Sequence, residues 1–251
     1  MVTSIIHMTA PHPPLPQYYP RESDRSSWVR SIFSRTAGDY DRVEIALSFG
    51  SGSWYRRRAL RNGGLRHGMS VLDIGTGTGL VARQAVTIVG DAALVTGVDP
   101  SPGMVANARV PAGVRLLSGS AEAIPADDGV ADFLSMGYAL RHVSDLPAAF
   151  LEFHRVLRPG GKVCLLEITQ PVGTWRRWLL KFWLRRVVPV VAAAVSRSKD
   201  MPSLMRYYWD TIEACVPPAT ILSALSAAGF VDVSRHVELG IFSEFRAVKP
   251  R

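Results

Sequence analysis

The chain has 251 residues, of which 47% are hydrophobic and 20% charged, and this composition excludes global disorder, collagen and coiled coil. Its length supports one substantial hydrophobic core, and its two cysteines are too few for a disulfide framework or a thiolate zinc site. The formal net charge of +8 suits an anionic partner, either nucleic acid or a lipid surface.

The N-terminal part of the chain divides into a proline-rich stretch and a helical one. The first 25 residues hold five prolines, and because proline interrupts helices and this stretch has little to bury, we expect a flexible tail over residues 1–25. The apolar spacing that follows predicts N-terminal helices over residues 26–66. These helices would open a single domain that spans residues 26–251.

The middle of the chain alternates between short apolar runs and helical stretches. The apolar runs, interpreted as strands, are residues 70–74, 94–98, 114–118, 131–136 and 162–168, and the helical stretches between them are residues 80–89, 102–108 and 148–157. This alternation predicts an α/β fold with a doubly wound, mostly parallel sheet that is buried on both faces.

The last third of the chain has a different pattern. Its first part is helical and basic, and we expect a helical lid over residues 171–215. A further helix is predicted over residues 217–228, and an antiparallel hairpin over residues 231–237 and 241–248. This final helix and hairpin, residues 216–251, would bring the sheet to seven strands.

The most specific motif is a glycine-rich turn after the first predicted strand. Gly75, Gly77 and Gly79 have a G-x-G-x-G spacing, which differs from the G-x-G-x-x-G of dinucleotide enzymes. Glycines there let a ligand approach the backbone at the start of a helix. The carboxylate of Asp73 would repel a pyrophosphate but suits a cationic ammonium or sulfonium, and Asp99, at the end of the second strand, can accept hydrogen bonds from ribose hydroxyls. The pattern favours S-adenosylmethionine over a phosphate-binding or purely structural loop.

Several stretches of the chain form a recognisable set. They are residues 33–41, 47–50, 71–79, 97–101, 119–125, 138–143 and 155–161. Together they resemble class I S-adenosylmethionine-dependent methyltransferases, and in particular the ubiquinone/menaquinone-biosynthesis C-methyltransferase family, over about residues 32–245. The resemblance implies a Rossmann-like fold whose cofactor-binding core is residues 67–170.

The resemblance also assigns residues to the methyl donor. The residues that it places against S-adenosylmethionine are Tyr40, Asp99, Pro100, Met104, Ser120 and Ala121. Tyr40 would hold the carboxylate end, Asp99 the ribose and Met104 the face of the adenine, with positions 120 and 121 at the adenine edge. The histidines show no ligand spacing, so we expect no metal site.

Three residues that follow the fourth predicted strand are candidates for contact with the methyl acceptor. Methyl transfer to a ring carbon requires an electron-rich ring, typically made so by removal of a phenolic proton. His142 could act as the base and Arg141 could stabilise the oxyanion, while Tyr138 would contact the acceptor. The alternative for His142 is a structural role in supporting the loop.

An aromatic and acidic cluster lies further along the chain. Tyr208 and Trp209 could sandwich a planar acceptor, with Asp210 or Glu213 available as a base. The alternative interpretation places the aromatic side chains in the core and the acids in solvent. Glu167 is a further pocket candidate, because a carboxylate in a buried strand needs a partner or a cavity.

Residues 175–195 predict a basic amphipathic helix. At helical spacing, Arg177, Lys181 and Arg185 share one face, and tryptophan, leucine and phenylalanine side chains crowd the other. Such a helix could lie at a lipid headgroup layer, cover a lipophilic acceptor as a lid, or pack on the sheet as an ordinary outer helix. Its charges and proline make it a poor bilayer span.

The sequence therefore predicts an S-adenosylmethionine-dependent methyltransferase that acts on a ring carbon of an electron-rich aromatic acceptor, such as a quinone precursor. The alternatives are a methyltransferase for a small phenolic or heteroaromatic metabolite, and a relative that binds S-adenosylmethionine without methylating. The sequence after the fourth predicted strand lacks the motif typical of enzymes that methylate nucleic-acid bases, so we expect no specific nucleic acid partner. We expect a cytoplasmic protein, with peripheral membrane contact and a homodimer as open alternatives.

Overall fold

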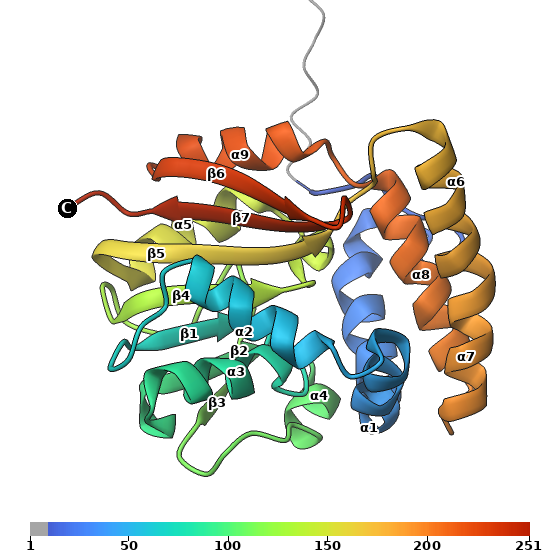
Figure 1. The fold of residues 1–251 in the computed structure, drawn as a ribbon, viewed down its shortest axis with the longest axis horizontal. Helices are drawn as coiled ribbons and strands as arrows, with labels where there is room; N and C mark the ends of the chain where they lie inside the picture. Colours follow the sequence, from blue (N-terminus) through green and yellow to red (C-terminus); the bar gives the residue numbers. More distant parts are fainter. Residues whose placement is uncertain (1–9) are drawn as a thin grey trace, which may run out of the picture.

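The computed structural model describes residues 10–251, and its centre is a seven-stranded sheet with the order β3-β2-β1-β4-β5-β7-β6 (Figure 1). The strands are β1 (Val71–Ile74), β2 (Val95–Asp99), β3 (Arg115–Ser118), β4 (Ala131–Gly137), β5 (Leu157–Ile168), β6 (Val231–Glu238) and β7 (Phe242–Val248). Strands β1 to β5 pair in parallel, and β7 lies antiparallel between β5 and β6. The predicted doubly wound sheet with a terminal antiparallel hairpin is confirmed.

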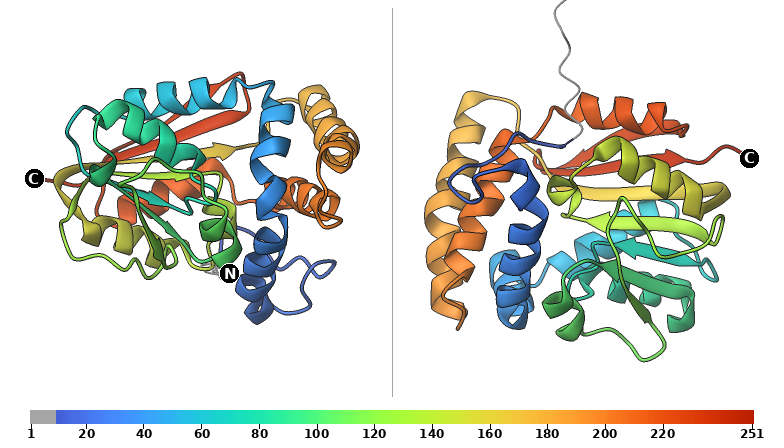
Figure 2. Two further views of the ribbon diagram at one scale, coloured as in Figure 1. Left: turned by 90° about the horizontal axis from the view of Figure 1, so that it is seen from below. Right: turned by 180° about the vertical axis from the view of Figure 1, so that it is seen from behind.

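Helices cover both faces of the sheet and one of its ends. They are α1 (Arg25–Ser48), α2 (Gly52–Asn62), α3 (Leu80–Val89), α4 (Pro102–Ala106), α5 (Leu146–Val156), α6 (Thr174–Phe182), α7 (Val188–Val195), α8 (Met201–Ala214) and α9 (Pro218–Ala227). Figure 2 shows α2 and α3 on one side of the sheet and α5 and α9 on the other.

The alternation of side chains along the strands explains why both faces are covered. Val71 and Phe133 pack in the cluster under α2 and α3, whereas Leu72 and Leu134 pack in the cluster under α5 and α9. Because successive strand residues point to opposite faces, an unbroken apolar strand needs helices on both sides.

A separate helical layer stands beyond the carboxyl ends of the parallel strands. It consists of α1, α6, α7 and α8, and α7 contacts both α1 and α8 (Figures 1 and 2). A five-residue π-helical segment, Trp183–Val187, joins α6 to α7 into one continuous rod. This layer has its own core, in which Ile32, Val188 and Tyr207 are buried.

The prediction of a flexible tail is wrong for residues 10–25. Leu15, Tyr19 and Arg25 are buried, and the Tyr18 hydroxyl donates a hydrogen bond to Asp210 at 2.7 Å. The prolines do exclude a helix, but the apolar side chains between them pack into the core of the helical layer. The remaining residues of the predicted tail, 1–9, lie outside the described residues.

Two further expectations are adjusted by the structure. Strand β5 begins at Leu157, five residues earlier than predicted, because the pairing with β4 starts at Leu157 and resumes at Lys162 across an irregular segment. Helix α7 packs on α1 and α8 rather than on the sheet, and α6 is linked to α8 by the pair between Lys181 and Glu213. Within residues 10–251, no helix is both long enough and apolar enough to cross a bilayer.

Candidate active site

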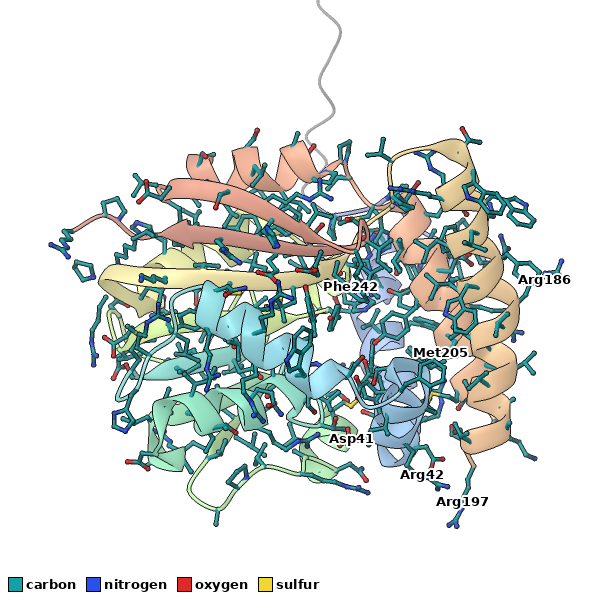
Figure 3. The ribbon with its side chains drawn as sticks, in the orientation of Figure 1. Asp41, Arg42, Arg186, Arg197, Met205 and Phe242 are labelled. Atoms are coloured by element: carbon teal, nitrogen blue, oxygen red, sulfur yellow. The ribbon has the colours of Figure 1, made fainter. Side chains whose placement is uncertain are left out.

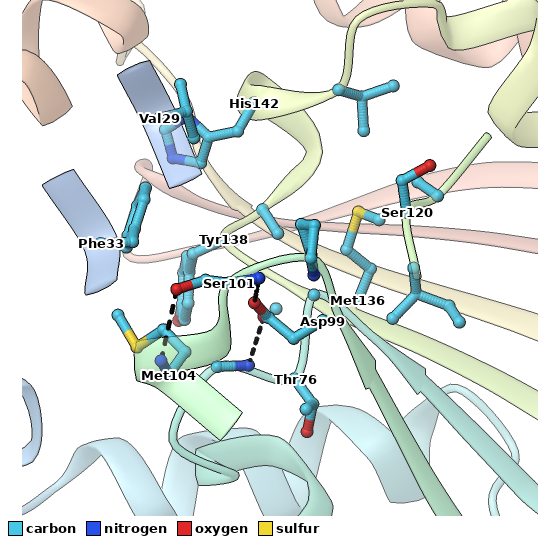
Figure 4. A pocket seen from close by; sticks show the side chains of 18 of the residues that line it. Val29, Phe33, Thr76, Asp99, Ser101, Met104, Ser120, Met136, Tyr138 and His142 are labelled. Atoms are coloured by element: carbon cyan, nitrogen blue, oxygen red, sulfur yellow. Dashed lines mark hydrogen bonds between the residues drawn. The ribbon is translucent and has the colours of Figure 1, made fainter. Parts of the chain in front are cut away.

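One large cavity, of about 490 Å³, lies where the carboxyl ends of β1, β2 and β4 meet α1 and α8 (Figure 4). Open parallel sheets bind ligands at this edge because the loops that follow the strands diverge there. The loop after β1 contributes Gly75 and Gly77, the loop after β2 contributes Asp99, and α1 contributes Phe33. The sheet and the helical layer therefore enclose one common space.

The glycine turn has the backbone conformation that its sequence predicts. Gly77 lies in the left-handed region (φ 55°), and a Cβ there would meet only the Met104 sulfur, at 3.9 Å. Gly79 (φ 86°) begins α3, and a Cβ there would lie 2.3 Å from Val110. Gly75 and Gly77 line the cavity, whereas Gly79 does not. Gly79 therefore serves the packing of the turn rather than contact with a ligand.

Asp99 presents a carboxylate at the cavity wall. Its Oδ2 accepts a hydrogen bond from the Gly77 N–H at 2.8 Å, and its Oδ1 accepts one from the Ser101 N–H at 2.8 Å (Figure 4). Burial raises the pKa of Asp99, and the two backbone donors oppose that rise. The side chain is fixed on both oxygens, and each oxygen keeps lone pairs for a ligand hydroxyl.

The residues expected around an adenine are gathered beside Asp99. Pro100, Met104, Ser120 and Ala121 all line the cavity. Met104 is nearly fully buried, and its N–H donates to the Ser101 hydroxyl that caps α4 (Figure 4). Four of the predicted donor-binding positions therefore share one wall.

Asp73 does not line the cavity. Its Oδ2 accepts a hydrogen bond from the Thr76 hydroxyl at 2.7 Å, and its Oδ1 accepts one from the Ser135 hydroxyl at 2.7 Å. Burial raises the pKa of Asp73 to about 6, against the effect of these hydrogen bonds. The prediction that Asp73 contacts a cationic ligand directly is not supported. Asp73 instead holds the hydroxyl of Thr76, and Thr76 lines the cavity.

The side of the cavity away from Asp99 is aromatic. Val29 and Phe33 come from α1, Tyr208 comes from α8, and Tyr138 and His142 follow β4. The Phe33 and His142 rings meet edge to face at 5.1 Å between centroids, an arrangement that aromatic rings favour. Tyr138, Tyr208 and His142, which the sequence predicts as acceptor contacts, thus line one cavity.

The His142 side chain is half-buried at the cavity wall. Burial lowers the pKa of His142 well below its usual value, and the nearby charge of Arg141 lowers it further. Its Nδ1 is 3.3 Å from the Tyr207 hydroxyl, and its Nε2 has no partner among the described residues. A neutral imidazole can exchange hydrogen bonds with an acceptor, but a pKa this low makes it a weak base.

Arg141 lies behind the cavity wall rather than on it. Its guanidinium pairs with the Glu167 carboxylate, and its Cζ lies 5.3 Å from the Tyr208 ring centroid. Both charged side chains are almost completely buried. The prediction that Arg141 contacts the acceptor oxyanion is not supported, because its charge is already paired. The pair instead gives Glu167 the partner that its buried position requires.

Two other predicted acceptor residues also lie outside the cavity. Trp209 is fully buried, and its Nε1–H donates to Glu213 at 3.0 Å. Asp210 accepts the hydrogen bond from Tyr18. The prediction of an aromatic sandwich is therefore wrong for Trp209, because successive helical residues point in different directions and only Tyr208 points to the cavity. Of the predicted lid, α6 and α7 contribute nothing to the lining.

Tyr40 and Arg56 complete the wall between α1 and α2. The Tyr40 hydroxyl lies 2.5 Å from the Tyr208 hydroxyl. Arg56 is 4% exposed, its Nη2 donates to Glu44 at 2.9 Å, and its Nε and Nη1 have no partner among the described residues. Arg56 is not among the predicted site residues, because it stands in a run of arginines. Its signal was the helical spacing to the apolar Ala59 and Leu60, which places it on the inner face of α2.

Among the residues that the structure describes, no three histidine, cysteine, aspartate or glutamate side chains come together as a metal site would require.

Comparisons with known proteins give a consistent result. The model of the ubiE/COQ5 methyltransferase family matches residues 21–249. The chain is 33% identical to the ubiquinone/menaquinone biosynthesis C-methyltransferase UbiE of Rubrivivax gelatinosus, over 86% of this chain and 84% of that protein. It is 30% identical to the 2-phytyl-1,4-naphtoquinone methyltransferase of Thermosynechococcus vestitus, over 84% of this chain and 94% of that protein. Among solved structures, it resembles a SAM-dependent methyltransferase from Thermotoga maritima with a TM-score of 0.60 and 22% identity, over 87% of this chain and 98% of that one.

Proposed function

Because the chain belongs to the ubiE/COQ5 methyltransferase family and is therefore an S-adenosylmethionine-dependent methyltransferase, we propose that it methylates a ring carbon of an electron-rich aromatic acceptor such as a quinol precursor. The observation that carries the proposal is the continuity of the cavity. A polar wall around Asp99 and an aromatic wall around Phe33 and His142 enclose one space. A donor on the first wall and a planar ring on the second would have their reacting atoms side by side.

The residues of the polar wall fit S-adenosylmethionine. Asp99 keeps free lone pairs for the ribose hydroxyls, the backbone at Gly77 is open to close approach, and Met104 offers an apolar face for adenine. When bound, S-adenosylmethionine would supply a methyl group on a positively charged sulfur. The ring carbon would gain that methyl group as the carbon–sulfur bond breaks with its electron pair left on sulfur, and the proton displaced from the ring carbon would pass to solvent.

Arg56 fits the carboxylate end of the donor. A buried guanidinium with unpaired Nε and Nη1 needs an acceptor, since an arginine cannot lose its charge. Glu44 satisfies only Nη2. A carboxylate placed between Arg56 and Tyr40 would satisfy the remaining donors and fix the donor in register with Asp99.

The residues of the aromatic wall would hold the acceptor ring. Phe33 and Tyr208 lie 6.1 Å apart between ring centroids, nearly perpendicular to each other, and both line the cavity with Val29. These side chains exclude water from a planar ring. In the tautomer protonated at Nδ1, the free Nε2 of His142 would accept a hydrogen bond from a phenolic hydroxyl and so increase the electron density of the ring.

The proposal is tested by incubating the protein with S-adenosylmethionine labelled in the methyl group and a panel of phenols and quinols with and without prenyl chains. We expect label on a ring carbon of a prenylated quinol and an equal amount of S-adenosylhomocysteine, both measured by mass spectrometry. Exclusive methylation of short, unprenylated phenols would favour the metabolite-methylating alternative. Label on oxygen alone would contradict ring-carbon transfer.

The partners of the protein follow from the same proposal. We expect a small aromatic acceptor and no specific nucleic acid, so that binding to DNA or RNA should be weak and should vanish as salt is added. A homodimer stays a prediction, which light scattering of the purified protein tests directly.

A further inference from the structure

The outermost helix of the molecule exposes a continuous row of large apolar side chains. This row, the aromatic stripe, consists of Trp175, Trp178, Leu179, Phe182 and Trp183. Their side chains are between 40% and 67% exposed. Single exposed apolar residues are normal on a soluble protein, but a contiguous row of five marks an interaction surface.

The stripe is ordered rather than merely exposed. The Trp175 and Trp178 rings stack at 5.8 Å between centroids and 18° between planes, and the Trp178 and Phe182 rings stack at 5.8 Å and 15°. The spacing of three and four residues places these rings along one side of α6. A flat aromatic surface about two helical turns long therefore faces away from the sheet.

The stripe contributes little to the core of its own layer. Leu184, Val188 and Ala192, on the opposite side of the rod, make the contacts with the core formed by α1 and α8. Lys181 also lies toward α8, where it pairs with Glu213 at 2.5 Å. The helix thus turns a polar and aliphatic side inward and its tryptophans outward, which is the reverse of an ordinary surface helix.

The segment of the chain that carries the stripe has charges of one sign. Between Glu167 and Asp200 the chain has no acidic residue. The basic residues in that interval are Arg176, Arg177, Lys181, Arg185, Arg186, Arg197 and Lys199. Arg186 extends from the rod into solvent (Figure 3), and Arg176, Arg177 and Arg185 are likewise exposed. The exposed arginines on the same rod as the apolar row have no acidic neighbour in that interval, and Glu213 of α8 pairs with Lys181 alone. A helix of this kind matches a surface that is apolar beneath and anionic on top.

We propose that the aromatic stripe docks the protein on the surface of an anionic lipid bilayer, with α6 lying along the headgroups. Tryptophan rings favour the headgroup region, and arginines beside them pair with lipid phosphates. A second copy of the same chain is a poorer occupant, because the two stripes would bring their arginines together without acidic partners. The docking does not depend on which acceptor the enzyme methylates, and either proposal can fail without the other.

The experiment measures the partition of the full-length protein onto vesicles by flotation. The vesicles are phosphatidylcholine alone or phosphatidylcholine mixed with phosphatidylglycerol. We expect the wild type to bind the mixed vesicles, and W175S/W178S/F182S to bind them roughly tenfold more weakly or worse, because three interfacial rings are lost. The matched control W54S/L151S removes two side chains that are exposed to a similar degree, 62% and 58%, on other helices, and should bind like the wild type.

A charge variant and a measure of oligomeric state complete the test. R176E/R177E should lose binding to the mixed vesicles while its melting temperature stays that of the wild type, and added salt should weaken wild-type binding in the same way. The proposal is overturned if the wild type does not bind the mixed vesicles, or if the control loses as much binding as the stripe variant. It is also overturned if light scattering shows that the wild type is a dimer and the stripe variant is a monomer, since the stripe would then bind a second copy of the chain.

Discussion

The buried pair between Arg141 and Glu167 gives the sharpest test of how the site is supported. Both side chains are at most 3% exposed, and the Glu167 Oε1 also accepts a hydrogen bond from the Arg141 N–H at 3.3 Å. Removing either partner leaves the other side chain buried without its opposite charge. The two single variants, Arg141→Met and Glu167→Gln, nevertheless differ in what the remaining residue can do.

Glutamine at 167 leaves the guanidinium of Arg141 charged, since arginine does not lose its proton in proteins. Loss of one partner from a buried pair costs about 3–5 kcal/mol. For a chain of this size, each kcal/mol lowers the melting temperature by roughly 2–4 °C. We therefore expect Glu167→Gln to melt roughly 6–20 °C below the wild type, by a margin that does not change with pH.

Methionine at 141 leaves a carboxyl group that can take up a proton. Burial already raises the pKa of Glu167, and the charge of Arg141 opposes that rise, so the variant raises the pKa further. A group with a raised folded-state pKa contributes stability at low pH that is lost as the pH rises. Relative to an unfolded pKa of 4.5, neutralising Glu167 costs about 3 kcal/mol at pH 7 and about 1 kcal/mol at pH 5.

The assay is thermal and urea unfolding of the wild type, both single variants and Arg141→Met/Glu167→Leu, each at pH 5 and pH 7. Arg141→Met should recover most of its lost stability at pH 5, Glu167→Gln should not, and the double variant should be more stable than Glu167→Gln at both pH values. The reasoning fails if the two single variants lose the same free energy of unfolding at both pH values.

Three more predictions follow from the site and the N-terminal segment. In calorimetry, Arg56→Met should weaken binding of S-adenosylhomocysteine roughly 10- to 150-fold and leave binding of methylthioadenosine, which lacks the carboxylate, unchanged. Asp99→Ala should weaken the binding of both ligands. Equal effects of Arg56→Met on the two ligands would refute the role of Arg56. Burial lowers the pKa of His12 to about 4 and that of His142 well below 6.5. The free energy of unfolding should therefore fall by about 1.4 kcal/mol per pH unit for each histidine as the pH drops below 6.5. A His12→Asn/His142→Asn variant with an unchanged dependence on pH would contradict this. Deleting residues 1–24 should lower the free energy of unfolding by at least about 3 kcal/mol, because two large side chains leave the core; an unchanged melting temperature would restore the idea of a flexible tail.

The sheet and the polar wall of the cavity could be predicted because short stretches of sequence determine them. The glycine spacing after β1 and the carboxylate that ends β2 are each readable within a few residues, and parallel strands bring such turns to one edge of the sheet. Asp73 shows the limit of this reasoning. Its position in the motif is the expected one, but two neighbouring hydroxyls use its oxygens, and neither Thr76 nor Ser135 marks that role in the sequence.

The acceptor side could be predicted only in part, because side-chain direction on long helices depends on tertiary packing. Tyr208 and Trp209 are neighbours in the chain, yet one lines the cavity and the other is fully buried elsewhere. The burial of Tyr19 could not be predicted for a similar reason, because the core that it joins includes side chains of α8, far along the chain. Proline content describes what local structure a segment excludes and says nothing of what the segment packs against.

The π-helical segment between α6 and α7 has a consequence for how this protein can change over time. Each residue of an α-helix turns the direction of the next side chain by about 100°, and a π-helical turn shifts that phase once, at Trp183–Val187. The side chains of α7, which contact α1 and α8, and the stacked rings of α6 therefore follow helical phases that differ. A one-residue deletion or insertion before Leu184 would turn the preceding rings relative to the side chains of α7 that contact α1 and α8.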